Sequence, residues 1–163
     1  MDKKLFLTGY IAGILLTIAI GYYGYRKMTY SPDIELGKIE INDLSGVPLN
    51  LASQHQRPIV VNFWATWCGP CRQEFPHFSQ AYKKYGDKVN FVMISDEETE
   101  KIATFKTTSM LPFFFVRSVK PLSDYDISSI PVTYFFNAGG ELVSKHSGTM
   151  ELAEIEKEIQ KCL

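Results

Sequence analysis

The 163-residue sequence predicts an α/β domain with a mixed β-sheet covered on both faces, preceded by an apolar N-terminal helix. Three observations lead to this prediction. Strand-like and helical patterns alternate through the middle of the chain, a hairpin signal and an amphipathic segment close it, and a long uncharged run stands near its start. Hydrophobic residues make up 45% and charged residues 21%, a balance typical of a chain that folds around a core.

The uncharged run extends from Leu5 to Tyr25, which is long enough to cross a bilayer because about 20 residues are needed. Three tyrosines gather at its end, ahead of Arg26 and Lys27, as suits the headgroup region. A cleaved signal peptide would have an apolar stretch of about 7–15 residues and a small-residue cleavage site, and neither is seen. We therefore predict an uncleaved membrane anchor over residues 1–27.

The charge of the chain is unevenly distributed. The net charge is −1, so the composition does not indicate binding to nucleic acid. The first 27 residues carry four basic residues and one aspartate, a net +3, which leaves −4 for the remainder. Lys3 and Lys4 favour a cytoplasmic N-terminus, but Arg26 and Lys27 oppose this orientation. We predict a single-pass protein of the cell membrane with its N-terminus in the cytoplasm, and the charges alone favour this only slightly.

After the anchor, residues 28–36 are short and polar and are interpreted as a linker, and residues 37–163 as the globular domain. Residues 59–64 and 89–94 are apolar, β-branched runs typical of buried strands. Between them, four aromatic residues recur at helical spacing, and Gly86 marks the end of that helix. These aromatic residues are Phe75, Phe78, Tyr82 and Tyr85.

The second half of the domain continues the alternation. Residues 97–109 have a helical pattern, and residues 113–116 read as a third strand. Two further strands, 132–136 and 141–145, flank Asn137-Ala138-Gly139-Gly140, which is a hairpin signal. The last segment, 151–162, is amphipathic, with one face formed by Leu152, Ile155, Ile159 and Cys162.

The chemistry of the chain is indicated by Trp67-Cys68-Gly69-Pro70-Cys71, at the start of the first helix of the domain. Helix N-termini and such motifs lower a cysteine pKa from about 8.5 to as little as 3.5–7.5, which produces the thiolate that attacks disulfides. We expect Cys68, nearer the helix start, to be the nucleophile and Cys71, one turn later, to resolve the mixed disulfide. Gly69 allows close approach of a substrate, and Pro70 suits the first helical turn.

Two other interpretations of this pair are weaker. A structural zinc site needs four ligands, and the remaining cysteine and the histidines are singly placed, so no metal is expected. A purely structural disulfide would close too short a loop to stabilise the fold by more than roughly 2 kcal/mol. We expect no cofactor other than the redox-active Cys68–Cys71 disulfide itself.

The run VVNFWATWCGPC (residues 60–71), the helix proline Pro76 and Ile130-Pro131 resemble the thioredoxin superfamily. More narrowly, NFWATWCGPCRQEFP resembles the TlpA/ResA/CcmG branch of membrane-anchored, extracytoplasmic thiol–disulfide oxidoreductases. The resemblance covers most of residues 37–163. It implies a thioredoxin fold with Pro131 in the cis form beside the active cysteines, where the backbone edge at Ile130 would pair with an extended substrate strand.

Several residues depart from, or add to, this pattern. Asn62 stands where cytoplasmic thioredoxins have a buried aspartate, and an amide cannot take a proton from Cys71. Glu74 matches a glutamate of the reductase branch and is the better candidate for tuning the cysteines. We expect Trp67 to shape the site and Cys162 to be buried and inert.

Two polar features are assigned no role in the chemistry. The acidic run Asp96-Glu97-Glu98 falls where some relatives place active-site groups, but is interpreted as the negatively charged start of a helix. His77 lies on the helix of the motif without an evident partner and is expected at the surface.

Three functions remain open at this level. In the first, the domain faces outside the cytoplasm, takes electrons from a membrane thiol donor and reduces protein disulfides, for which the resemblance suggests apocytochrome c. In the second, it is an oxidase or isomerase of exported proteins. In the third, it is a binding module with little turnover. The first is preferred because of the anchor, the Gly-Pro pair between the cysteines and the resemblance.

Overall fold

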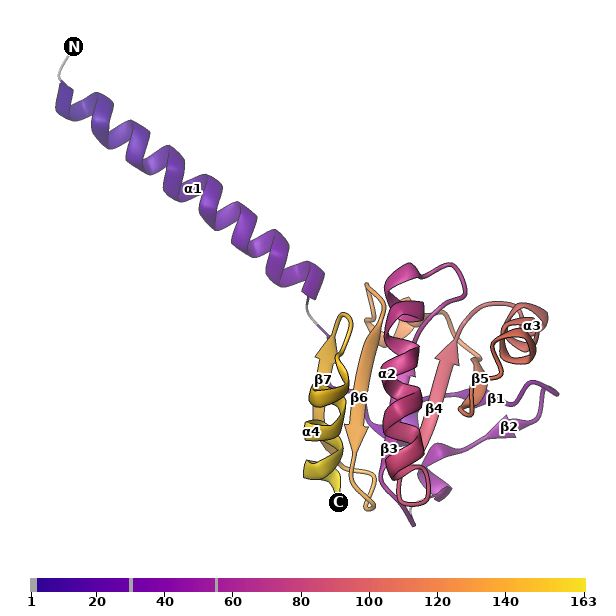
Figure 1. The fold of residues 1–163 in the computed structure, drawn as a ribbon. Coiled ribbons are helices and arrows are strands. Elements are labelled where there is room, and N and C mark those ends of the chain that lie inside the picture. Colours follow the sequence, from indigo (N-terminus) through magenta and orange to yellow (C-terminus); the bar gives the residue numbers. More distant parts are fainter. Residues whose placement is uncertain (1–2, 30, 55) are drawn as a thin grey trace. The chain divides into compact units, whose positions relative to one another are not determined.

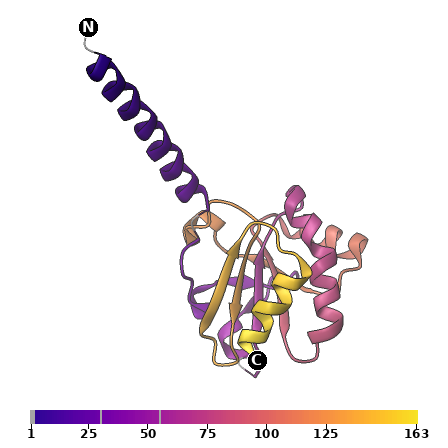
Figure 2. The ribbon, with the colours of Figure 1, turned by 60° about the vertical axis from the view of Figure 1, so that its left-hand side comes forward.

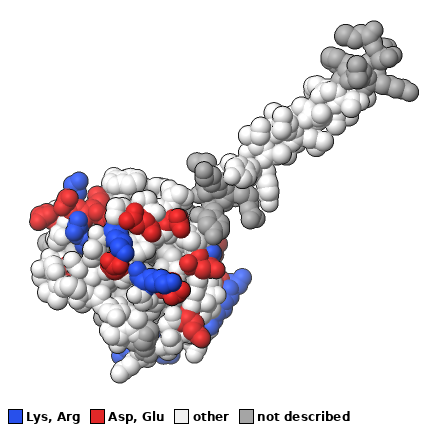
Figure 3. Space-filling view, turned by 180° about the vertical axis from the view of Figure 1, so that it is seen from behind, with Lys and Arg blue, Asp and Glu red and all other residues white. Residues whose placement is uncertain are grey.

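The computed structural model describes residues 3–29, 31–54 and 56–163, and the chain divides after residue 30 into two compact units. The N-terminal unit is the helix α1 (Lys3–Thr29). Its segment Leu7–Tyr25 is a candidate membrane span by length and composition. The described side chains of this segment are uncharged, and nearly all are exposed to the surroundings (Figure 3).

The second unit, Ser31–Leu163, is built on a seven-stranded sheet in the order β2-β1-β5-β4-β3-β6-β7 (Figure 1). The central pairs β5–β4 and β4–β3 are parallel, and the outer pairs are antiparallel, so the sheet is mixed as predicted. The strands are β1 (Ile41–Asn42), β2 (Pro48–Leu49), β3 (Ile59–Phe63), β4 (Asn90–Ser95), β5 (Phe114–Ser118), β6 (Val132–Phe136) and β7 (Leu142–Ser147).

Both faces of this sheet are covered. The helices α2 (Gly69–Tyr85) and α4 (Leu152–Cys162) lie side by side on one face, and α3 (Thr99–Ser109) packs near β5 (Figures 1 and 2). The other face is covered by apolar residues of the N-terminal segment and of three short 3-10 helices. These are η1 (Leu36–Lys38), η2 (Leu51–Gln54) and η3 (Leu122–Tyr125).

The globular unit extends further toward the N-terminus than the predicted 37–163. Ile34 and Leu36, which the sequence places in a linker, are buried in the second core cluster. The Tyr134 hydroxyl donates to the carbonyl of Pro32 at 3.1 Å. Strands β1 and β2 were not predicted, because two residues are too few to show the alternation that identifies a strand.

A cluster of aromatic rings joins the helices to the sheet directly behind the Cys68 loop. Trp64 follows β3, is fully buried, and its ring lies 5.3 Å from Phe75 on α2. It also lies 4.6 Å from Phe105 on α3 and 5.4 Å from Phe115 on β5. Edge-to-face and tilted pairs at these distances are favourable beyond the burial of their area. The Trp64 side chain therefore connects the end of β3 with α2, α3 and β5.

The replacement Phe75→Ala tests this cluster. Phe75 is 2% exposed, and removing a buried phenylalanine side chain leaves a cavity, so we expect the free energy of unfolding to fall by about 3–5 kcal/mol. Urea denaturation of the protein in detergent measures this change. The matched control is Phe114→Ala, which removes a 41% exposed ring and should cost less than about 1 kcal/mol. Equal losses in the two variants would contradict the assignment of Phe75 to the core.

Candidate active site

The two cysteines of the motif lie where β3 gives way to α2. Cys68 is the N-cap of α2, in extended conformation, and Pro70 occupies the first helical turn, where its missing N–H leaves no bond unmade. The backbone N–H of Cys71 donates to Cys68 Sγ at 3.2 Å, so the sulfur itself caps the helix. The Cys68 sulfur therefore lies at the positive end of the helix dipole, which favours a thiolate.

Cys68 and Cys71 form a disulfide, with an S–S distance of 2.03 Å and a Cα–Cα distance of 5.3 Å. Cys68 is 4% exposed and Cys71 is completely buried. The peptide bond between Ile130 and Pro131 is cis, and Cys68 Sγ lies 3.8 Å from the Ile130 carbonyl oxygen. The fold thus brings together cysteines and a backbone edge separated by about 60 residues in the sequence.

The groove beside this disulfide is mainly apolar. Trp67 forms part of its wall and is 73% exposed, which is unusual for so large a ring. The remaining lining residues come from the end of β4 and the segment around η3, namely Asp96, Leu122, Ser123, Ile127, Ser128, Ser129 and Ile130. Trp67 and Ile130 therefore line this groove, whereas Trp64, which the sequence leaves open between the site and the core, is fully buried in the core.

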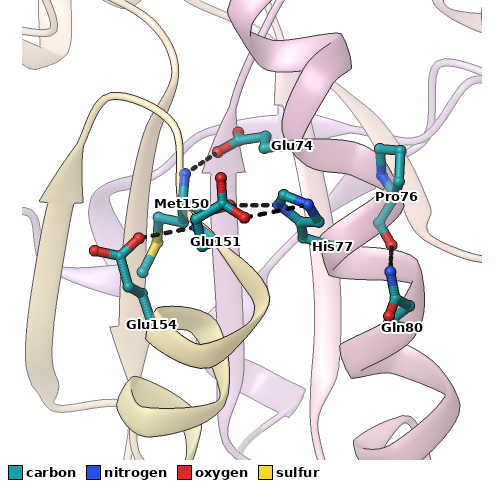
Figure 4. A network of polar contacts seen from close by, with 7 residues as sticks. All are labelled: Glu74, Pro76, His77, Gln80, Met150, Glu151 and Glu154. Atoms are coloured by element: carbon teal, nitrogen blue, oxygen red, sulfur yellow. Dashed lines mark hydrogen bonds and ion pairs between the residues drawn. The ribbon is translucent and has the colours of Figure 1, made fainter.

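Glu74 is a buried carboxyl on the inner face of α2, one turn beyond Cys71. Its Oε1 accepts a hydrogen bond from Asn62 Nδ2 at 2.8 Å, and its Oε2 accepts one from the Met150 backbone N–H at 3.1 Å (Figure 4). Burial raises the pKa of Glu74 to about 7, although both hydrogen bonds oppose this by favouring the charged form. A carboxyl that titrates near neutral pH can both take up and release a proton.

Asn62 supports Glu74 from the sheet. Its Nδ2 group donates both to Glu74 and, at 2.9 Å, to the hydroxyl of Thr133 on β6. Within the described part of the chain its Oδ1 has no hydrogen-bond partner. The amide that replaces the thioredoxin aspartate therefore serves as a donor to a carboxylate, and Glu74 is left as the acidic group of this pair.

The interpretation of the acidic run after β4 as the start of a helix is correct for Glu98, which is the N-cap of α3, and wrong for Asp96 and Glu97, which precede the helix. The carboxylate of Glu97 instead accepts from the Thr66 backbone N–H at 2.5 Å and from the Thr66 hydroxyl at 2.8 Å. Asp96 accepts from the Leu122 backbone N–H at 2.9 Å. Glu97 thus holds the loop that precedes Cys68.

A signal for the Glu97–Thr66 contact was present in the sequence. Both residues follow the carboxyl ends of predicted strands, and the ends of neighbouring parallel strands meet at one edge of a sheet. The contact could therefore have been anticipated once β3 and β4 were known to be neighbours.

The prediction that Cys162 is buried is confirmed, whereas the prediction for His77 is wrong. The thiol of Cys162 is buried as expected, donates to the Glu158 carbonyl at 3.4 Å, and its pKa is raised to about 11 chiefly by burial. His77, by contrast, is not a partnerless surface residue. Its Nδ1 lies 3.0 Å from the Met150 carbonyl oxygen, and its Nε2 lies 3.4 Å from a carboxylate oxygen of Glu151 (Figure 4).

A mixed sheet of this topology, with a dithiol–disulfide pair at a helix N-terminus opposite a cis-proline, defines a thiol–disulfide oxidoreductase of thioredoxin type. The chain belongs to the AhpC/TSA family, whose family model matches residues 31–145. Within that family it is a thiol–disulfide oxidoreductase similar to the proteins named ResA, StoA and DsbE.

Two curated relatives illustrate the similarity. The thioredoxin-like protein YneN of Bacillus subtilis is 35% identical over 166 residues, covering 94% of this chain and 98% of the relative. The thiol–disulfide oxidoreductase ResA of the same organism is 29% identical, covering 91% of this chain and 87% of ResA.

Solved structures show the same fold at lower sequence identity. A thioredoxin-family thiol:disulfide interchange protein of Chlorobium tepidum superimposes with a TM-score of 0.66 at 22% identity, covering 81% of this chain and 99% of that structure. StoA of Bacillus subtilis superimposes with a TM-score of 0.62 at 21% identity, covering 77% and 98%.

The unusual ionisation of Glu74 predicts how stability depends on pH. An unfolded glutamate titrates near 4.5 and the folded one near 7, so the folded protein binds an extra proton between these values. Stability is therefore greatest below about pH 4.5 with respect to this group and falls as the pH rises to 7, by about 3 kcal/mol in all. The Glu74→Gln variant should lose this dependence, which urea unfolding of both oxidised proteins from pH 5 to 8 would reveal. Parallel curves for the two proteins would contradict the prediction.

Proposed function

We propose that this protein is a membrane-anchored reductase of protein disulfides outside the cytoplasm. The observation that supports this most directly is the Cys68–Cys71 disulfide at the N-terminus of α2, one turn from the buried carboxyl of Glu74. The pair is the redox group, and no further cofactor takes part in the proposed reaction. Each turnover moves two electrons from the Cys68/Cys71 dithiol to one substrate disulfide.

In the first step the Cys68 thiolate attacks one sulfur of the substrate disulfide. A bond forms between Cys68 Sγ and that sulfur, the substrate S–S bond breaks, and the other substrate sulfur leaves as a thiolate. Cys68 is slightly more exposed than Cys71, 4% against 0%, and its sulfur caps the helix N-terminus, and both features support its role as nucleophile.

In the second step Cys71 attacks the Cys68 sulfur of the mixed disulfide. The Cys68–Cys71 bond forms and the second substrate thiolate leaves. The thiol of Cys71 must first lose its proton. Cys71 and Glu74 are both buried and lie three residues apart on α2, hence on one face of the helix, and the pKa of Glu74 near 7 suits it to take that proton and return it to the leaving sulfur.

The approach of the substrate follows from the surroundings of Cys68. An extended polypeptide that pairs with the backbone edge at Ile130 would bring its disulfide within reach of Cys68 Sγ, since the Ile130 carbonyl lies 3.8 Å from that sulfur. The groove lined by Trp67 and Ile130 would receive a neighbouring apolar side chain. Gly69, where an added Cβ would meet nothing within 4 Å, leaves open space beside the cysteines.

The location outside the cytoplasm is supported by α1 and by the redox chemistry. The described residues contain one candidate span, which lies near the N-terminus. Lys3 and Lys4 before it slightly favour a cytoplasmic N-terminus, against Arg26 and Lys27 after it, and this orientation puts the catalytic domain on the other side of the cell membrane. Disulfides persist there, so a reductase has substrates, and it must be re-reduced by a thiol donor in the membrane. Apocytochrome c, the substrate suggested by the resemblance to the TlpA/ResA/CcmG branch, is a protein of this compartment.

The reduction potential of the Cys68/Cys71 pair tests the direction of electron flow. We expect a value close to the roughly −270 mV of thioredoxin, because the two share the Gly-Pro pair that separates the cysteines. Equilibration with glutathione or dithiothreitol redox buffers, followed by thiol alkylation, measures this potential. A value near the roughly −120 mV of strong oxidants would instead assign the protein as an oxidase of exported proteins.

The Cys71→Ser variant tests the roles of the two cysteines. Because it cannot resolve the mixed disulfide, it should accumulate substrates covalently bound to Cys68, visible on non-reducing gels of cells that express it. Cys68→Ser is the matched control and should trap nothing. Trapped proteins should be exported or membrane proteins if the domain lies outside the cytoplasm, and trapping on Cys68→Ser alone would reverse the assignment.

A further inference from the structure

Helix α2 binds both backbone groups of a single residue, Met150, in the segment between β7 and α4. The Met150 N–H donates to Glu74 Oε2 at 3.1 Å, and the Met150 carbonyl lies 3.0 Å from His77 Nδ1. Glu74 and His77 are three residues apart, so they project from the same side of the helix. Figure 4 shows the two side chains reaching toward the chain just before α4.

The hydrogen on the His77 ring can be assigned from its partner. A carbonyl oxygen only accepts, so in this contact Nδ1 carries a hydrogen and donates to Met150, whether the ring is neutral or protonated. The other nitrogen, Nε2, faces the carboxylate of Glu151 at 3.4 Å, and Glu151 is in turn fixed as the N-cap of α4 by its capping box with Glu154. The ring is therefore oriented on both edges.

The segment that carries Met150 is held at two points. The Gly148 N–H donates to the carbonyl of Pro131 at 2.8 Å, which ties the start of the segment to the cis-proline. His77 ties its end to α2. If the bond from His77 were lost, the Gly148–Pro131 bond and the bond from the Met150 N–H to Glu74 would remain, but α2 would no longer hold the Met150 carbonyl, and the Met150 backbone would be freer to turn about the remaining bond.

We propose that His77 is a positioning residue for Glu74: by donating to the Met150 carbonyl it fixes the Met150 N–H that binds the buried carboxylate. Among the described residues no contact between His77 and the cysteines is recorded, and it acts through the backbone of Met150, whose carbonyl and N–H belong to the two peptide groups on either side of one Cα. The consequence for turnover rests on the proposed function, in which ionised Glu74 accepts the proton of Cys71. A well-placed N–H stabilises the ionised form of Glu74. His77 therefore raises the fraction of Glu74 that is ionised, and so able to act as a base, at neutral pH.

Other ionisable groups lie on the elements that pack around Glu74, and they stay unchanged in the test. Cys68 and Cys71 precede Glu74 on α2 but are joined in a disulfide in the oxidised protein, and the start of α4 carries Glu151, which lies beside His77, and Glu154. On β7, His146 pairs with Thr133 and lies in the same row as Asn62 on the face that α2 covers. Strands β3 and β6 contribute only Tyr134, which packs on the opposite face, and the Lys84–Glu156 pair lies about three turns further along α2.

The titration of Glu74 tests the proposal directly. Carbon-13 NMR of carboxyl-labelled full-length protein in detergent would follow this group in the oxidised wild type, His77→Leu and His77→Asn. We expect His77→Leu to move the midpoint to higher pH. His77→Asn should keep the wild-type midpoint, because its Nδ2 can replace Nδ1 as donor to Met150. An unchanged midpoint in His77→Leu, or an equal shift in His77→Asn, would overturn the proposal.

A double-mutant cycle separates positioning from simple packing of α2 on α4. The measured rate is the resolution by Cys71 of a preformed mixed disulfide between Cys68 and glutathione. We expect His77→Leu to slow it on the order of threefold at pH 7, and to have no effect when Glu74 is already glutamine. The same slowing with and without Glu74 would show that His77 acts through packing alone. Neither readout depends on whether the protein is a reductase or an oxidase. A failure of the proposed function can therefore be distinguished from a failure of the proposal for His77.

Discussion

The contact between Trp64 and Phe75 holds the N-terminal half of α2 on the sheet, and the geometry of the active site depends on it. Trp64 lies four residues before Cys68 and Phe75 lies four residues after Cys71, so their packing fixes the chain on both sides of the disulfide. The same cluster includes Phe105 and Phe115, which anchors α3 and β5 to it. The cysteines are thus held against a buried aromatic cluster, with Cys68 at 4% exposure next to the exposed Trp67.

On this support the protein keeps a carboxyl group in an environment that disfavours its charge. The two hydrogen bonds from Asn62 and Met150 offset only part of the desolvation of Glu74, so the group titrates near neutral pH at some expense of stability. Buried, perturbed carboxyls of this kind concentrate at functional sites, because a proton acceptor works best when its pKa is close to the ambient pH.

Three segments surround the cysteines, two of them remote in sequence, and each is held by a specific polar contact. Glu97 holds the loop before Cys68 through Thr66, Gly148 binds the carbonyl of Pro131, and His77 holds Met150. The contacts of Gly148 and His77 also connect the cis-proline edge, where a substrate would pair, to Glu74, the proposed acceptor of the Cys71 proton.

The sequence by itself determined the chemistry and the class of fold. The spacing of Cys68 and Cys71 at a helix start, the apolar strand patterns and the hairpin at residues 137–140 are local properties, and local periodicity and turn chemistry are visible in a single sequence. The tertiary structure alone decided what each polar residue near the cysteines does. The roles of Glu97 and His77 depend on contacts 31 and 73 residues away, and β1 and β2 are too short to leave a pattern. Such contacts arise only when neighbouring strand ends and helix faces meet, because a side chain on its own carries no record of the distant backbone group that it will bind.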